Sequence, residues 1–291
     1  MPGLQFIKIL GNLKFFSHSL KLPVDFKKPS GDPAGKHYND AFQPADRIAI
    51  PTLIPPWFMP AEIPNKYYQD QCDKIGNNFK ELHDTMIDAV GFAHTMWKLQ
   101  SKFQGITIMA VSANGKPGCL TGPSLENFIT KFPLCAAWTG NKAKYRDAVA
   151  KGVGKCFKDW QDNLTIPGLP LFPAFAAFPG PMAPPMPNVP VPLIACPSAM
   201  MSSLLMPDTM KSEMINAFDG GLKEKDKDKQ HEAVFDGIAT VLSLAFLIWM
   251  ASQQVMLVMG KGSIPTFAPP YVPVGPVVGG DNLPIPGHLM A

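Results

Sequence analysis

The sequence predicts a mainly α-helical protein whose long helices are joined by extended, proline-rich segments, with few short strands and an extended N-terminal arm. The first observation is the placement of its 32 prolines, because residues 65–116, 134–166 and 208–264 contain none. Proline removes a backbone donor and clashes with the preceding helical turn, so helices belong in these three intervals. The second observation is that apolar residues recur there at helical spacing. The third is a composition of 46% hydrophobic and only 17% charged residues, which excludes a disordered chain.

Residues 1–64 are predicted to form the extended arm, because five prolines fall within 51–64 and lysines alternate with phenylalanines before them. The local charge is too low for an arm that binds nucleic acid. We therefore expect this segment to dock on a neighbouring subunit, with Trp57 and Phe58 as anchors. The N-terminus does not indicate a secretory signal, because lysines interrupt its apolar residues.

Residues 65–133 are predicted to form a long helix followed by a short strand. A seven-residue apolar repeat, typical of a helix that packs along a seam, is formed by Cys72, Ile75, Phe79, Leu82, Met86, Ala89, Ala93 and Met96. The expected charge pairs beside the seam are absent, which favours packing within a larger bundle. The strand is expected at Ile106–Val111, with a turn at Asn114-Gly115.

Residues 134–207 are predicted to form a helix and then a proline-rich strap. One apolar stripe at helical spacing contains Tyr145, Val149, Gly152, Val153, Cys156 and Trp160. The lysines lie mostly off this stripe and indicate a solvated face. Twelve prolines follow within 167–207, where we expect extended chain.

Residues 208–291 are predicted to contain a short helix capped by Asp208, a solvated polar bridge at 223–229, a long apolar helix at 232–259 and a second strap. The two straps share a pattern of Phe-Ala, Pro-Pro and alternating Val and Pro over 172–193 and 264–280. A duplication explains this pattern, and convergent composition is the alternative.

The segment from Gly237 to Gly260 has 24 residues without a charge, long enough to cross a bilayer core of about 30 Å. Two interpretations stand: a single membrane pass at 238–259, or a helix buried on all sides in an oligomer. The polar run at 252–254 favours the oligomer, since lipid would leave two amides unsatisfied. The expected oligomer interface consists of Ile238, Val241, Leu242, Leu244, Ala245, Phe246, Leu247, Ile248, Trp249, Val255, Met256, Phe267, Tyr271, Val274, Trp57 and Phe58.

The sequence contains no motif for catalysis, so we expect no enzyme, no cofactor and no metal. The "KGVGKC" stretch at 151–156 lacks the third glycine and the strand of a dinucleotide site. His83 and His94 lie about three helical turns apart, too far for one metal ion, and are expected at a surface or interface. Cys119 is expected to be a buried thiol. The net charge of +3 excludes nucleic acid as the main partner.

Helix blocks joined by passages such as "FAAFPGPMAPPMPNVPVPL", with low charge, resemble minor structural proteins of bacteriophage tails and baseplates and of related contractile injection systems. The resemblance implies a structural virion or injection-particle component, assembled in the cytoplasm, whose partners are copies of itself and other structural proteins, without a small-molecule substrate. Subunits would share a helical core and be pinned by the straps. The alternative is a single-pass membrane-associated protein, such as an injection or pore component.

Overall fold

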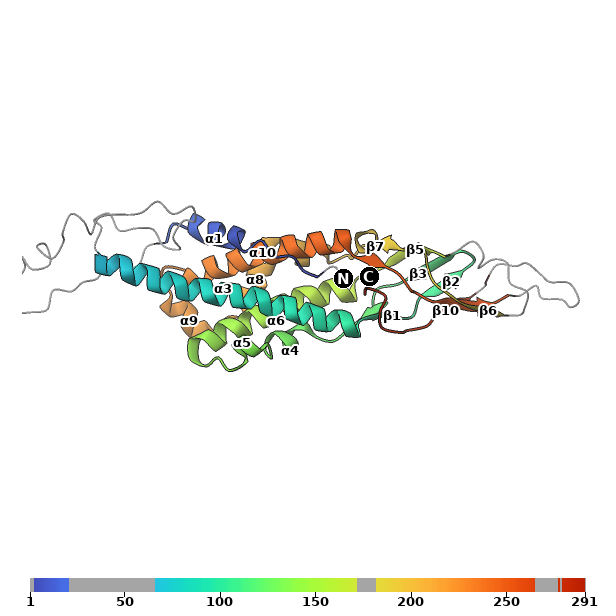
Figure 1. Cartoon of the computed structure of the whole chain (residues 1–291), viewed down its shortest axis with the longest axis horizontal. Helices are drawn as coiled ribbons and strands as arrows, with labels where there is room; N and C mark the ends of the chain where they lie inside the picture. Colours follow the sequence, from blue (N-terminus) through green and yellow to red (C-terminus); the bar gives the residue numbers. More distant parts are fainter. Residues whose placement is uncertain (1–2, 21–65, 172–181, 265–276, 278, 291) are drawn as a thin grey trace, which may run out of the picture.

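A computed structural model describes residues 3–20, 66–171, 182–264, 277 and 279–290, with the backbone alone for 66–72. The molecule is elongated, with a bundle of helices at one end and a β-sheet at the other (Figure 1). The predicted mainly helical class is therefore confirmed in its coarse form, although the sheet is larger than expected.

The longest helices of the described residues fall into the three proline-free intervals, whereas the helical elements at 8–17, 125–129, 193–195 and 201–205 lie outside them. The helical elements are α1 Lys8–Ser17, α3 Lys66–Gln100, α4 Leu125–Ile129, α5 Pro133–Ala136, α6 Gly140–Asp162, α7 Met201–Leu205, α8 Pro207–Ala217, α9 Gly220–Lys225, α10 Gln230–Ser252 and the 3-10 turn Leu193–Ala195. α3, α6, α8 and α10 form the body of the bundle, and α1 lies along α10 (Figure 1).

Helix α3 is buried on more than the predicted seam. The seam residues Leu82, Met86, Ala89 and Ala93 are all buried. His83 and His94, expected at a surface or interface, are fully buried as well, which corrects that prediction. Val90 and Trp97 extend the buried face. The helix is therefore enclosed by several elements, because a single seam would leave these side chains in water.

Helix α6 confirms the predicted apolar stripe, and its glycines explain the "KGVGKC" stretch. A Cβ at Gly152 would lie 2.6 Å from the backbone nitrogen of Met214 in α8. A Cβ at Gly154 would lie 3.1 Å from the Cβ of Glu126 in α4. Both glycines therefore permit close helix packing, which is their structural role here.

Helix α10 ends at Ser252, seven residues before the predicted end. Gln253 is fully buried, and its Oε1 accepts hydrogen bonds from Lys98 Nζ at 2.8 Å and Trp249 Nε1 at 3.1 Å. The chain then becomes the strand β8, Gln254–Val255, which pairs with β7, Val191–Pro192. This buried amide network stops the helix, because it holds the backbone after Ser252 in an extended conformation.

The polar bridge contains the cap of α10. The carboxylate of Asp226 accepts from the backbone nitrogens of Gln230 at 3.0 Å and His231 at 2.8 Å. These are orphan donors of the first turn, and a side-chain acceptor satisfies them. Asp208 plays no such role, since α8 begins at Pro207 without a side-chain cap.

Replacing Asp226 with alanine is expected to lower the free energy of unfolding by about 1 kcal/mol, because two first-turn donors lose their acceptor. Asp228→Ala, an exposed neighbour in the same bridge, is the matched control and should change stability by no more than about 0.5 kcal/mol. Urea denaturation of both variants measures the difference; equal stabilities would contradict the capping role.

Part of the predicted N-terminal arm is a helix that packs onto the bundle. α1 crosses α10 where Gly11 meets Gly237, since a Cβ at Gly237 would lie 2.9 Å from the Gly11 oxygen. The buried carboxylate of Asp236 contacts His18 at 2.8 Å and Lys14 at 3.5 Å. These contacts, together with the buried Gly11, Asn12 and Phe15, fix one face of α1 against the bundle. The remaining arm, 21–65, lies outside the described residues.

Within the described residues, six strands form one sheet in the order β5-β3-β2-β10-β9-β6. They are β2 Thr107–Met109, β3 Ser112–Gly115, β5 Ile166–Pro170, β6 Met182–Met186, β9 Gly260–Ser263 and β10 Gly280–Asn282. β1 Lys102–Phe103 pairs with β4 Leu120–Thr121. The prolines of the sheet lie in β5 and β6, its two outermost strands. Proline has no N–H to donate, so it is tolerated at such positions and not in the middle.

The first strand and turn of the sheet differ from the prediction. The chain reverses at Ala110-Val111, with Ala110 at a φ of 52°, and not at Asn114-Gly115, which lie within β3. The expected strand 106–111 is thus split between β2 and its turn. An Asn-Gly pair is a strong turn signal, but here pairing with β5 holds both residues extended.

Strand pairing and hydrogen bonds hold the described C-terminal residues in the interior of the molecule. β10 lies between β2 and β9. Asn282 accepts a hydrogen bond from the Ile106 nitrogen at 3.1 Å and donates one to the Phe103 oxygen at 2.9 Å. His288 Nδ1 accepts from the Phe103 nitrogen at 3.0 Å. The end of the described chain therefore belongs to the core, although its sequence predicted a strap on a neighbour.

The segments 65–133, 134–207 and 208–291 are interleaved in space. Each contributes helices to the bundle and two strands to the six-stranded sheet. One continuous hydrophobic core contains buried residues of all three. Their proline-marked borders lie within the bundle, since Pro133 begins α5 and Pro207 begins α8.

Candidate binding site

The predicted interface residues of the apolar helix lie mostly inside one chain. Ile238, Val241, Leu242, Ala245, Phe246, Trp249 and Val255 are each at most 1% exposed. An interface between copies was expected on the premise that one chain lacks the surface to cover these residues. α1, α3 and α8 supply that surface, so these residues form the monomer core.

The other predicted interface residues fall into two groups. Leu244 and Met256 are half-buried, while Leu247 and Ile248 are 41% and 36% exposed. Those outside the described residues are Phe267, Tyr271, Val274, Trp57 and Phe58. Within the described residues, α10 is the one helix long and apolar enough to cross a membrane, and 78% of its most apolar window is buried by protein.

The thiols of the described residues are not prepared for nucleophilic chemistry. Cys119, Cys135, Cys156 and Cys196 are free and buried. Burial raises the pKa of Cys119 to about 11 and that of Cys156 and Cys196 to about 12, and it also raises the pKa of Cys135. The thiolate is the reactive form, so these groups are protonated and inert at neutral pH. The described residues also hold no group of three His, Cys, Asp or Glu side chains able to bind a metal.

His94 lies at the centre of the bundle inside a cage of aromatic rings. Its ring centroid lies 4.4 Å from that of Trp249 and 5.8 Å from that of Trp97, and Phe157 and Phe246 complete the cage at 6.2 Å. Neither ring nitrogen has a hydrogen-bond partner among the described residues. Burial, and secondarily the charge of Lys98, lowers its pKa to about 3. His94 is therefore neutral and serves as a core side chain.

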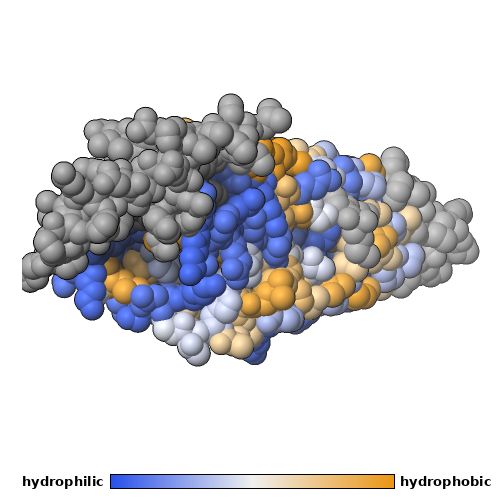
Figure 2. Space-filling view, turned by 60° about the vertical axis from the view of Figure 1, so that its left-hand side comes forward, coloured by the Kyte–Doolittle hydropathy of each residue, from blue (hydrophilic) through white to orange (hydrophobic). Residues whose placement is uncertain are grey.

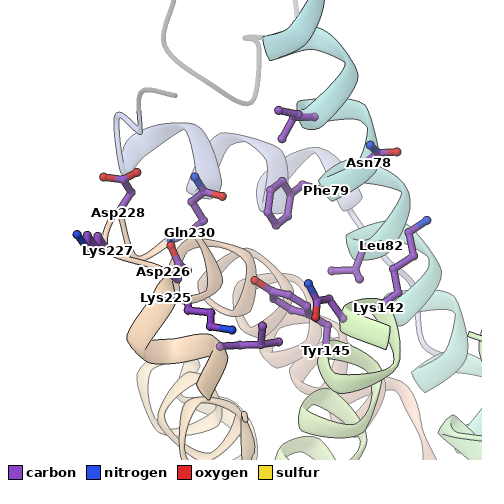
Figure 3. A pocket seen from close by; sticks show the side chains of 13 residues that line it. Asn78, Phe79, Leu82, Lys142, Tyr145, Lys225, Asp226, Lys227, Asp228 and Gln230 are labelled. Carbon is purple, nitrogen blue, oxygen red and sulfur yellow. The ribbon is translucent and has the colours of Figure 1, made fainter. Parts of the chain in front are cut away.

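A pocket of about 710 Å³ lies at the end of the bundle farthest from the sheet. Its walls come from three segments: α3, the start of α6, and the connection from α9 to α10 (Figure 3). The apolar lining consists of Ile75, Phe79, Leu82, Tyr145 and Leu222. A volume within about 300–1,000 Å³ and a largely apolar lining are usual for binding pockets. Sequence reasoning missed this site, because its walls are far apart in the chain.

Two aromatic rings and a charged rim define the chemistry of this pocket. Phe79 and Tyr145 meet edge to face at 6.4 Å between centroids, and their side chains face the same space (Figure 3). Burial, and secondarily the charge of Asp226, raises the pKa of Tyr145, so its phenol is protonated. The rim carries Lys142, Lys225 and Lys227 beside Asp226 and Asp228. The pocket therefore suits an apolar or aromatic ligand with polar ends.

The other candidate surface is the sheet end, where the described ends of several strands lie. The strand registers put the turn at 109–112, and the described residues that border 172–181 and 265–276, at the end of the sheet away from the bundle (Figure 1). The pairs that establish this are Pro170 with Ser112, Gly280 with Ile108, and Met182 with Ser263. None of these connecting residues is charged.

Described side chains at this sheet end are apolar and exposed. Met109 is 56% exposed, Val111 44% and Met182 58%. On the face shown in Figure 2, hydrophilic residues cover much of the helical end, although Leu134 at that end is 66% exposed. Exposed apolar side chains beside uncharged chain connections are typical of an interaction surface.

No family model, curated protein or solved structure matches this chain. The two surfaces just described, the bundle pocket and the uncharged sheet end, are therefore the features on which a function can be argued.

Proposed function

We propose that the protein is a structural component of a large symmetric assembly, of the kind found in phage tails, baseplates and contractile injection systems, and that copies associate through the sheet end. The observation that carries this proposal is the absence of charge from all three segments that connect strands at this end of the sheet. Segments 172–181 and 265–276 alone contain Phe172, Phe175, Phe178, Phe267 and Tyr271. Aromatic residues supply much of the binding energy of protein interfaces.

The mode of assembly proposed here differs from a shared helical core. The apolar helix is covered by its own chain, so the bundle is complete in one copy. Association through one end of an elongated molecule leaves the bundle free to contact other proteins. Proline-rich connections suit this role, because their restricted backbone loses less entropy when they bind.

This proposal is tested by replacing segments 172–181 and 265–276 together with Gly-Ser sequences of equal length. The wild-type protein is expected to form a multimer of fixed mass, and the replaced variant a monomer with an unchanged circular dichroism spectrum. Multi-angle light scattering over a hundredfold range of concentration measures the mass. Removal of all of 264–291 would not serve, because it takes β10 out of the middle of the sheet.

The matched control is Leu134→Ser on α5, which removes a side chain that is 66% exposed at the helical end. It should leave the multimer intact. A wild-type protein that stays monomeric at every concentration would contradict the proposal, and so would a loop-replaced variant of unchanged mass.

A further inference from the structure

We propose that the bundle pocket binds residues 51–60, "PTLIPPWFMP", of the same chain, with Trp57 among its aromatic and apolar walls. Residues 51–60 lie outside the described residues. The proposal concerns the helical end of the molecule and is independent of association through the sheet end.

The chemistry of the pocket fits a proline-rich ligand. Prolines 51, 55, 56 and 60 give this segment a preference for the polyproline II conformation. Such segments dock in grooves lined by aromatic rings, at low entropic cost because proline has already restricted the backbone. Phe79 and Tyr145 supply the rings, and Ile75, Leu82 and Leu222 supply apolar contact for a large side chain.

The chain enters and leaves the pocket's end of the bundle at both borders of segment 21–65. Phe15, near the end of α1, contacts Phe79 with ring centroids 6.0 Å apart. α3 begins at Lys66, nine residues before Ile75, which places its start about 14 Å from the pocket wall. Nine residues also separate Trp57 from Lys66, and they reach up to about 30 Å when extended.

This tether favours the segment of the same chain over a second copy. A short connection between two binding groups gives an effective concentration on the order of millimolar, above any realistic concentration of free protein. Weak intrinsic affinity for the pocket is then sufficient for occupancy.

The charges around the pocket agree with this occupant. Residues 48–61 carry no charge, matching the apolar walls, and Glu62 follows directly. Lys225 and Lys227 lie on the rim, where they offer partners to a carboxylate at one end of the bound segment. A charge at the centre of a bound ligand would lose its hydration against the rings of Phe79 and Tyr145 and would find no ion-pair partner there.

The experiment uses the full chain labelled with 5-fluorotryptophan and observed by ¹⁹F NMR. Trp57→Phe identifies the resonance of Trp57 among the five tryptophans. Ile75→Lys then places a charge in the apolar wall from a half-buried position of α3. We expect the Trp57 resonance of this variant to take the chemical shift and the solvent isotope shift of a free peptide spanning 48–62. The resonances of Trp97, Trp160 and Trp249, which are buried in the core, should not move.

The matched control is Leu134→Lys, an equal change at an exposed site outside the pocket, which should leave Trp57 unmoved. If Trp57 has the peptide's shift already in the wild-type protein, the proposal is overturned. Ile75→Ala is a milder variant that should fold even if Ile75→Lys does not. It should move the Trp57 resonance part of the way toward the position of the free peptide. If the resonance moves in neither variant, the proposal is also overturned.

Mixing decides between the same chain and a second copy. Labelled Ile75→Lys protein retains an intact segment 51–60, so added unlabelled wild-type protein offers it an intact pocket. If each wild-type pocket is filled by the segment of its own chain, it does not bind the labelled segment. The Trp57 resonance of the labelled protein then stays at the position of the free peptide. Its return to the wild-type position upon mixing would show that the segment binds a neighbouring copy and would overturn the proposal.

Discussion

Replacing Gly152 with alanine is expected to lower the free energy of unfolding by about 2 kcal/mol, the cost of overpacking a close helix contact. The added Cβ would lie 2.6 Å from the Met214 nitrogen and 2.7 Å from its Cα, both backbone atoms of α8. Neither can rotate away as a flexible side chain would, so α6 and α8 must separate. This cost exceeds the gain of up to about 1 kcal/mol that alanine offers within a helix.

The measurement is thermal and urea denaturation of a graded glycine series. Gly220→Ala is the control, because nothing lies within 4 Å of its Cβ position. Gly154→Ala should fall between the two, since its Cβ would meet the Glu126 Cβ at 3.1 Å. A Gly152→Ala variant as stable as the Gly220→Ala variant would contradict the close packing of α6 on α8.

The second large effect is acid destabilisation caused by His94. The folded protein keeps His94 neutral because burial lowers its pKa to about 3, whereas the unfolded chain binds a proton below about pH 6.5. The unfolded state therefore takes up more protons as the pH falls from 6.5 toward 3, and stability falls over this window. At pH 5 the loss from this one residue is about 2 kcal/mol relative to pH 8.

His94→Leu should flatten the dependence of stability on pH between 6.5 and 3. It should also stabilise the protein at pH 7 by about 1 kcal/mol, because two buried nitrogens without partners are removed. His288→Leu should have the opposite sign at pH 7, since His288 Nδ1 accepts a hydrogen bond from the Phe103 nitrogen. Burial lowers the pKa of His288 to about 4, so this variant should also flatten the pH dependence below pH 6.5. Urea denaturation at each pH measures both; an unchanged slope in His94→Leu would contradict the role of His94.

Proline positions and helical spacing predicted the bundle well, because both are local properties. The stripe of α6 and the seam of α3 were identified from spacing alone, and Val149, Val153, Leu82 and Met86 are buried as expected. Local patterns report which face of a helix is apolar. They do not report how many other elements pack around that helix, and so His83 and His94 were misplaced.

The burial of α10 could not be predicted from its own residues. A charge-free helix has the same sequence whether lipid, a second copy or its own chain covers it. The deciding surface comes from α1, α3 and α8, which are distant in the chain. The contact between α1 and α10 is one such case, because a Cβ at Gly11 would lie 3.1 Å from the Gly237 oxygen.

The six-stranded sheet was underestimated because its strands are three to five residues long and some contain proline. Strand prediction depends on alternating β-branched residues, which β6, "MAPPM", and β9, "GKGS", lack. These two segments become strands because they pair with strands that are distant in the sequence. The bundle pocket escaped prediction for a related reason, since Phe79, Tyr145 and Leu222 come together only in the folded chain.

The prolines in β5 and β6 have a consequence for crowded assemblies. An unprotected sheet border offers free N–H and C=O groups on which a strand of another molecule can grow, which is how many aggregates begin. Pro167, Pro170, Pro184 and Pro185 remove donors from both borders of this sheet. Many copies of this apolar chain can therefore be present at high local concentration without forming fibrils by strand pairing at these edges.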